Sequence, residues 1–104
     1  MILEIAEIEV KSGMEGEFEL GVAKAAPIFQ RAKGCRAMEL QRSIEKPSRY
    51  RLFVRWETLE SHTVDFRGSP DFEAWRKLVG HCFERPPEVE HTRLAVHGFG
   101  RICG

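Results

Sequence analysis

The sequence has few cysteines and no surplus of charge of either sign. Its three cysteines, Cys35, Cys82 and Cys103, are widely spaced and form no Cys-x-x-Cys pair, so neither a disulfide framework nor a zinc ribbon is indicated. The 16 lysines and arginines balance 16 aspartates and glutamates. This balance argues against nucleic-acid binding, because such proteins need excess basic charge to neutralise phosphates.

Long apolar runs and the motifs of common enzyme classes are also missing. No segment approaches the roughly 20 apolar residues that span a bilayer, and the acidic start at residues 1–4 is unlike a signal peptide. There is no phosphate-binding glycine loop, no Gly-x-Ser-x-Gly elbow and no His-Glu-x-x-His motif. We therefore expect a cytoplasmic protein without nucleic-acid or membrane partners.

With 104 residues, the chain has the length of one domain, with a core over about residues 2–97 and a glycine-rich tail over 98–104. Alternating and helical patterns of apolar residues predict its elements. These are strands over 2–10, 35–44, 50–56 and 88–97, helices over about 14–33 and 59–66, and a helix that starts at 70 and ends before 86.

Local signals set the expected ends of the helices. Thr58 and Ser69 are suited to cap the second and third helices, and Gly34 is suited to follow the end of the first. Pro27 lies inside the first helix and is expected to kink it or to split it in two.

The order strand, helix, strand, strand, helices, strand is typical of a ferredoxin-like α+β fold, with a four-stranded antiparallel sheet and helices on one face. Leu3, Ile5 and Phe53 have the parity of the other face. Apolar residues on an uncovered face usually mark an interface. We therefore expect a homodimer whose two sheets pack face to face.

Among the titratable residues, His62 is the candidate catalytic base, because it lies on the inner side of the short helix beside Phe66. The alternative is a structural histidine. A metal site built on the other histidines is not expected. His81 and Cys82 would point about 100° apart on an α-helix, and His91 and His97 would lie about 20 Å apart on one strand.

Aromatic residues gather near the predicted third strand and the last helices. They are ordinary core residues by their spacing, but they also suit the walls of a pocket for a flat aromatic ligand. Arg51 and Arg55 share a strand face, where either could stabilise a substrate oxyanion or form cross-strand ion pairs. The candidate cluster consists of Trp56, Phe66, Phe72, Trp75 and Phe83.

Several short motifs occur together in a characteristic order. They are Lys-x-Gly-x-Glu-x-x-Phe at 11–18, Gly-Cys at 34–35, Tyr-Arg-Leu-Phe-Val-Arg-Trp-Glu at 50–57, Leu-Glu-Ser-His at 59–62 and Ser-Pro-Asp-Phe at 69–72. In this order the chain resembles the antibiotic biosynthesis monooxygenase family over about residues 2–97. The resemblance implies a dimeric α+β barrel in which each subunit keeps a cavity between sheet and helices.

The resemblance also implies an activity. Several members of this family oxidise phenols, anthrones or quinols with molecular oxygen and use no metal, flavin or haem. In this chain His62 would be the base, and Trp56, Phe66, Phe72, Trp75 and Arg55 would bind the aromatic substrate. Phe66 and Asp71 stand where many members have histidine. Two alternatives therefore stay open: an isomerase or decarboxylase of the same fold, and a non-catalytic dimeric ligand-binding domain.

Overall fold

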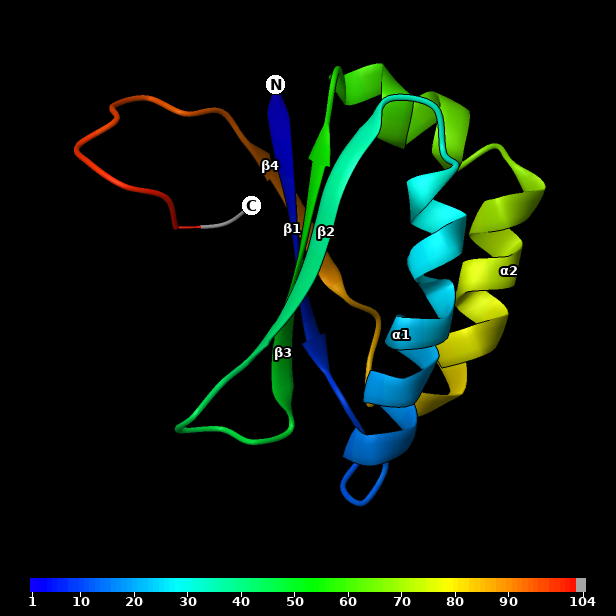
Figure 1. Cartoon of the computed structure of the whole chain (residues 1–104). Helices are drawn as coiled ribbons and strands as arrows, with labels where there is room; N and C mark the ends of the chain where they lie inside the picture. Colours follow the sequence, from blue (N-terminus) through cyan, green and yellow to red (C-terminus); the bar gives the residue numbers. More distant parts are fainter. Residues whose placement is uncertain (103–104) are drawn as a thin grey trace.

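A computed structural model describes residues 1–102 of the chain. A four-stranded antiparallel sheet of order β2-β3-β1-β4 forms one layer, and the helices cover one of its faces (Figure 1). This arrangement confirms the predicted ferredoxin-like α+β fold. The elements in chain order are β1 (Ile2–Glu9), α1 (Glu15–Gln30), β2 (Cys35–Arg42), β3 (Arg49–Trp56), η1 (Ser61–Phe66), α2 (Pro70–Val79), η2 (Gly80–Cys82) and β4 (Glu88–Thr92).

The alternation in the sequence decides which residues of the central strands face the helices. On β3, the even-numbered residues from Tyr50 to Trp56 are fully buried, and on β1 Ala6 and Ile8 are buried beside them. Burying apolar area contributes roughly 25 cal/mol per Å², so these two strands fix the sheet against the helices. The odd-numbered residues lie on the opposite face, which we call the open face.

Helix α1 runs without interruption through Pro27, so the expectation of a split helix was wrong. The proline removes one backbone donor near the end of the helix, on its exposed side, where the cost is smallest. Two salt-bridge hydrogen bonds from Arg31 to Asp71, at 2.7 and 3.0 Å, then join the end of α1 to the start of α2. The two helices are also joined by an edge-to-face contact of Phe29 with Trp75.

The short helix after β3 has an unusual form. The N–H of Ser61 donates to Thr58 Oγ1 at 3.1 Å, which confirms Thr58 as its cap. From Ser61 to Phe66 the helix is wound as a π-helix rather than an α-helix. Such wide turns are rare and are found frequently at functional sites. Ser69 caps α2 as predicted, and its side chain accepts from the N–H of Phe72.

The third helix and the last strand are shorter than the sequence pattern predicts. Helix α2 ends at Val79 and continues as the 3-10 turn η2. Strand β4 ends at Thr92, not at residue 97, because Thr92 pairs with Leu3 and β1 has almost no residues left beyond that point. Residues 93–102 continue as an irregular segment on the open-face side of the sheet (Figure 1).

Within residues 1–102, none of the helices has the length and apolarity needed to cross a bilayer. Cys103 lies outside the described residues.

Gly34 should be the glycine least tolerant of a side chain. It has a φ of +82°, and a Cβ atom would lie 2.4 Å from Ser61 Oγ at the entrance to η1. We expect Gly34→Ala to lower the free energy of unfolding by at least about 1 kcal/mol, the usual cost of a left-handed backbone.

Gly16 provides a matched control, because it lies on the exposed side of α1, where an added Cβ atom would have nothing within 4 Å. Gly16→Ala should raise the stability by about 0.5–1 kcal/mol. Urea unfolding of both variants checks this pair, and equal effects of the two substitutions would contradict it.

Candidate functional site

A carboxylic acid is buried on the helix-facing side of β1. Glu4 shares its parity with Ala6 and Ile8, and only 5% of the residue is exposed. Its Oε1 accepts a hydrogen bond of 2.9 Å from Nε1 of Trp56, the residue at the end of β3. A buried carboxyl group is costly unless it is hydrogen-bonded, so the burial of Glu4 depends on the hydrogen bond from Trp56.

The π-helix places His62 directly against this carboxyl group. His62 is 3% exposed, and its ring stacks on Trp56 with the centroids 5.2 Å apart. Its Nε2 lies 3.3 Å from Glu4 Oε1. Its Nδ1 lies 2.8 Å from Nε2 of His91. His91 belongs to the neighbouring strand β4 and is the register partner of Glu4. We call Glu4, Trp56, His62 and His91 the Glu4 cluster.

The cluster forms a continuous line of polar groups from the core toward the surface. Both ring nitrogens of His62 have a partner, one toward Glu4 and one toward His91. Glu4 and His62 are buried, whereas His91 is half-buried. A proton taken up at His91 could therefore reach Glu4 through the ring of His62, since each step spans one hydrogen-bond distance or slightly more.

Burial shifts the protonation of the cluster toward neutral forms. Desolvation raises the pKa of Glu4 to about 7, against the hydrogen bond from Trp56 and the positive charge of Arg67. Desolvation also lowers the pKa of His62 to about 4, helped by the charges of Arg67 and His91. The pKa of His91 is lowered by desolvation and by the charge of Arg67. Glu4 is thus the group of the cluster whose pKa lies nearest to neutral pH.

The predicted aromatic residues do meet beside the cluster. Phe66 contacts Trp56 and Phe72, with centroid distances of 5.4 and 5.8 Å. Trp75 is reached through Phe29 of α1, which contacts both Phe66 and Trp75. The rings pack against one another as a core, so a substrate between sheet and helices would need them to separate.

Two predicted members do not join this group. Phe83 packs against Phe18 at the other end of the helices, so its inclusion in the cluster was wrong. Arg55 has the odd parity of β3, and it lines a groove of the open face together with Leu3 and Phe53. The sheet itself separates Arg55 from His62.

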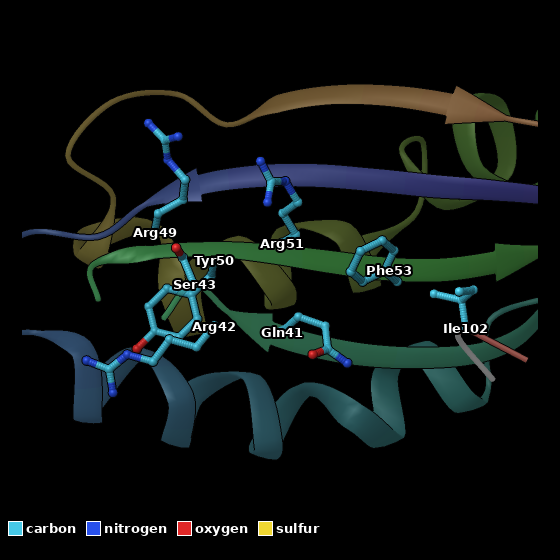
Figure 2. Close-up of a pocket in the computed structure, with 8 residues that line it drawn as sticks. All are labelled: Gln41, Arg42, Ser43, Arg49, Tyr50, Arg51, Phe53 and Ile102. Carbon is cyan, nitrogen blue, oxygen red and sulfur yellow. The ribbon is translucent and has the colours of Figure 1, made fainter. Parts of the chain in front are cut away.

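The open face carries charged as well as apolar side chains. Figure 2 shows Arg49, Arg51 and Phe53 following one another along β3, and Ile102 reaching the same face near Phe53. Arg49 and Arg51 both form salt bridges with Glu7, at 3.2 and 3.4 Å. The expected cross-strand pairing of Arg51 is therefore present.

Outside the cluster, one expectation about the histidines was wrong. His81 Nε2 and Cys82 Sγ lie only 3.6 Å apart. Both residues belong to η2, where neighbouring side chains point about 120° apart, but the two are adjacent in the chain and the long imidazole turns its Nε2 toward the thiol. His97, by contrast, contacts the carbonyl oxygen of Gly100 in the C-terminal segment.

Sequence reasoning missed two residues of the Glu4 cluster. Glu4 had a signal, since it interrupts the apolar series of Ile2, Ala6 and Ile8 on one strand face. A charged residue at a core position is rarely buried without a partner. His91 had no such signal, because only the register of β1 with β4 brings it to His62.

Comparison with known proteins places this fold and its sequence in one family. The model of the family described as antibiotic biosynthesis monooxygenase matches residues 1–78. The chain is also 41% identical over 91 residues to the uncharacterized protein YczJ of Bacillus subtilis (strain 168), covering 88% of this chain and 96% of that protein. The chain belongs to the antibiotic biosynthesis monooxygenase family.

Solved structures of this family agree with the fold. A Bordetella bronchiseptica protein assigned to the family is 56% identical, with a TM-score of 0.90 over 91% of this chain and 97% of that one. SnoaB, a cofactor-independent oxygenase from Streptomyces nogalater, has a TM-score of 0.78 at 19% identity, over 92% of this chain and 94% of that one. At such low identity the likeness shows the fold alone.

The opposed pKa shifts in the Glu4 cluster predict opposite effects of pH on stability. The pKa of Glu4 is raised from its usual 4.5 to about 7, so its contribution to stability falls as pH rises through that window. The pKa of His62 is lowered from 6.5 to about 4, so its contribution grows as pH rises through that window. The two effects partly cancel in the unmodified chain.

Single substitutions should reveal each effect. The stability of Glu4→Gln should rise between pH 4 and 6.5, and above pH 7 the variant should gain up to about 3 kcal/mol over the unmodified chain. The stability of His62→Phe should instead fall between pH 4.5 and 7. Urea unfolding at a series of pH values measures both, and profiles of the same slope would contradict the assignment.

Proposed function

We propose that this protein is a cofactor-independent monooxygenase that oxidises a phenolic, anthrone-like or quinol-like aromatic compound with molecular oxygen. Membership of the monooxygenase family supports the reaction class. The observation that carries the proposal is the line of three titratable groups, Glu4, His62 and His91, that runs from the core toward the surface beside the aromatic residues. Such a line can remove a proton from an acidic substrate without a bound cofactor.

The proposed first step is deprotonation of the substrate. His91, at the outer end of the Glu4 cluster, takes the proton on its Nδ1 and passes the proton of its Nε2 to His62 Nδ1. His62 passes its own Nε2 proton to Glu4. In this scheme His62 is the central proton carrier rather than an isolated base, and Glu4, whose pKa is raised to about 7, holds the proton.

The deprotonated substrate then supplies the electrons. An electron-rich anion reacts with oxygen directly, and exclusion of water protects the reactive intermediate. For an anthrone, the CH₂ carbon becomes a carbonyl that keeps one oxygen atom, and the other atom leaves as water with the two hydrogens. The four electrons come from the oxidised carbon, so the reaction balances without an added reductant.

Trp56, Phe66, Phe72 and Trp75 are the proposed walls for the substrate ring, because Trp56 and Phe66 contact His62 and the other two belong to the same group of rings. Because these rings are packed together, binding requires them to part. The proposed opening is between η1 and β4, where the Glu4 cluster comes closest to the surface.

Oxygen consumption with an anthrone and with a reduced naphthoquinone tests the proposal. We expect turnover, and we expect label from isotopic oxygen in the product. Glu4→Gln and His62→Phe should lower kcat/KM by about 10²-fold or more, the usual range for a lost acid–base group. His97→Ala, which alters a histidine outside the cluster, should leave turnover unchanged.

Other outcomes would favour the alternatives. Conversion of a substrate without oxygen uptake would indicate an isomerase or decarboxylase. A thermal shift with flat aromatic compounds but no conversion would indicate a ligand-binding domain. Full activity in both Glu4→Gln and His62→Phe would overturn the role of the cluster.

The proposed partner of the open face is a second copy of the chain. Leu3, Ile5 and Phe53 are half-buried there, and the groove that Leu3 and Phe53 line continues under residues 93–102. Leu94 and Phe99 in that segment are 75% and 94% exposed. Acidic Glu7 and basic Arg51 share the same face, so two copies can offer one another both signs of charge.

Sedimentation at micromolar concentration checks this partner. The unmodified chain should sediment as a dimer, and Phe53→Glu should be a monomer because a charge would be buried in the interface. Val64→Glu is the control, since Val64 is an exposed apolar residue of η1, away from the open face. A monomeric unmodified chain would overturn the pairing.

A further inference from the structure

A second group of side chains with metal-binding chemistry lies far from the Glu4 cluster. Glu17 belongs to the first turn of α1, and His81 and Cys82 belong to η2. Figure 1 shows that α1 begins at the end of the helical layer where α2 finishes, and that η1 lies at the other end. The two sites are therefore distinct, and the monooxygenase proposal does not involve these three residues.

Their ligand atoms converge on a small volume. Cys82 Sγ lies 3.6 Å from His81 Nε2 and 3.8 Å from Glu17 Oε2. The side chains of His81 and Glu17 are joined by a hydrogen bond, and all three ligand atoms lie within 4.8 Å of one another. Residues separated by more than 60 positions in the sequence are thus brought together by the packing of η2 on α1.

These spacings match the requirements of zinc. With Zn–S near 2.3 Å and Zn–N or Zn–O near 2.1 Å, a tetrahedral ion holds sulfur and its N or O ligands about 3.6 Å apart. Both contacts of Cys82 already have this length within a few tenths of an ångström. To admit the ion, the hydrogen bond between His81 and Glu17 must open, and the Cys82 thiol, which donates to Glu17, must release its proton to solvent.

The backbone holds the sulfur in place while the other two ligands can adjust. The carbonyl oxygen of Cys82 accepts a 2.8 Å hydrogen bond from the N–H of Lys11, and Val10 bridges to Phe83 beside it. Cys82 itself is fully buried, whereas the side chains of His81 and Glu17 are 52% and 58% exposed. An ion seated on the thiol would therefore face solvent between two adjustable ligands.

We propose that Glu17, His81 and Cys82 form a binding site for a zinc-like divalent ion, with water as the fourth ligand. A thiolate, an imidazole and a carboxylate are ligands that zinc and cobalt both accept. The ion would tie η2 to the first turn of α1 and stabilise the folded state by an amount that grows with the logarithm of the free metal concentration once the site is filled. The residues of the Glu4 cluster are not involved.

Titration of the metal-free chain with Zn²⁺ and with Co²⁺ tests this site. We expect one equivalent of metal per chain, a higher unfolding temperature with Zn²⁺, and a thiolate-to-cobalt charge-transfer band with Co²⁺. The cobalt titration uses a C35S/C103S variant as the parent chain, in which Cys82 is the remaining cysteine. The charge-transfer band therefore reports on the sulfur of Cys82 alone.

Because His81 and Glu17 are exposed, variants of these two ligands should still fold. His81→Ala and Glu17→Gln should each weaken zinc binding by more than the ~10–100-fold that loss of an outer-shell partner costs. His97→Ala, which alters a histidine of the C-terminal segment, should bind as the parent chain does. Absence of the cobalt band, or zinc affinity unchanged by both His81→Ala and Glu17→Gln, would overturn the proposal.

Discussion

The burial of one carboxyl group organises this fold around its candidate site. Glu4 is enclosed by the indole of Trp56, the ring of His62 and the strand that carries His91. A buried carboxyl needs hydrogen-bond donors, and few side chains can supply them in an apolar core. The end of β3 supplies the indole N–H, the π-helix brings the ring of His62 to 3.3 Å from the carboxyl, and the register of β4 brings His91 to the far side of that ring. Three separate parts of the chain thus depend on a single residue of β1.

Local sequence patterns, namely strand alternation and helix caps, predicted the order and type of the strands and helices well. The alternation of β3 and the caps at Thr58 and Ser69 place strands and helices where the structure has them. The errors about Pro27 and about the last strand have different causes. Pro27 is accommodated because it lies near the end of α1 on the exposed side. The last strand stops where β1 no longer offers pairing partners, which no local pattern in residues 93–97 reveals.

The candidate site could be predicted only in part, for a related reason. His62 and its aromatic neighbours were found because they share one helix face or one strand face. Glu4 was overlooked although a charge among apolar residues of one parity is a usable signal. The place of His91 depends on strand register, and the meeting of His81 and Cys82 with Glu17 depends on the packing of η2 on α1. Both arise from long-range packing rather than from spacing in the sequence.

The connections within the helical layer have a mechanical consequence. Arg31 holds Asp71 at one end of the layer, Phe29 packs on Trp75 close to that pair, and Glu17 contacts His81 at the other end. Because these contacts join the helical segments at both ends, we expect α1 and α2 to move together over the sheet. The π-helix η1 has none of these three contacts. It is attached to the sheet instead, by the stacking of His62 on Trp56 and by the contact of His62 with His91, so a shift of the helices over the sheet would reach the Glu4 cluster through the contact of Phe29 with Phe66.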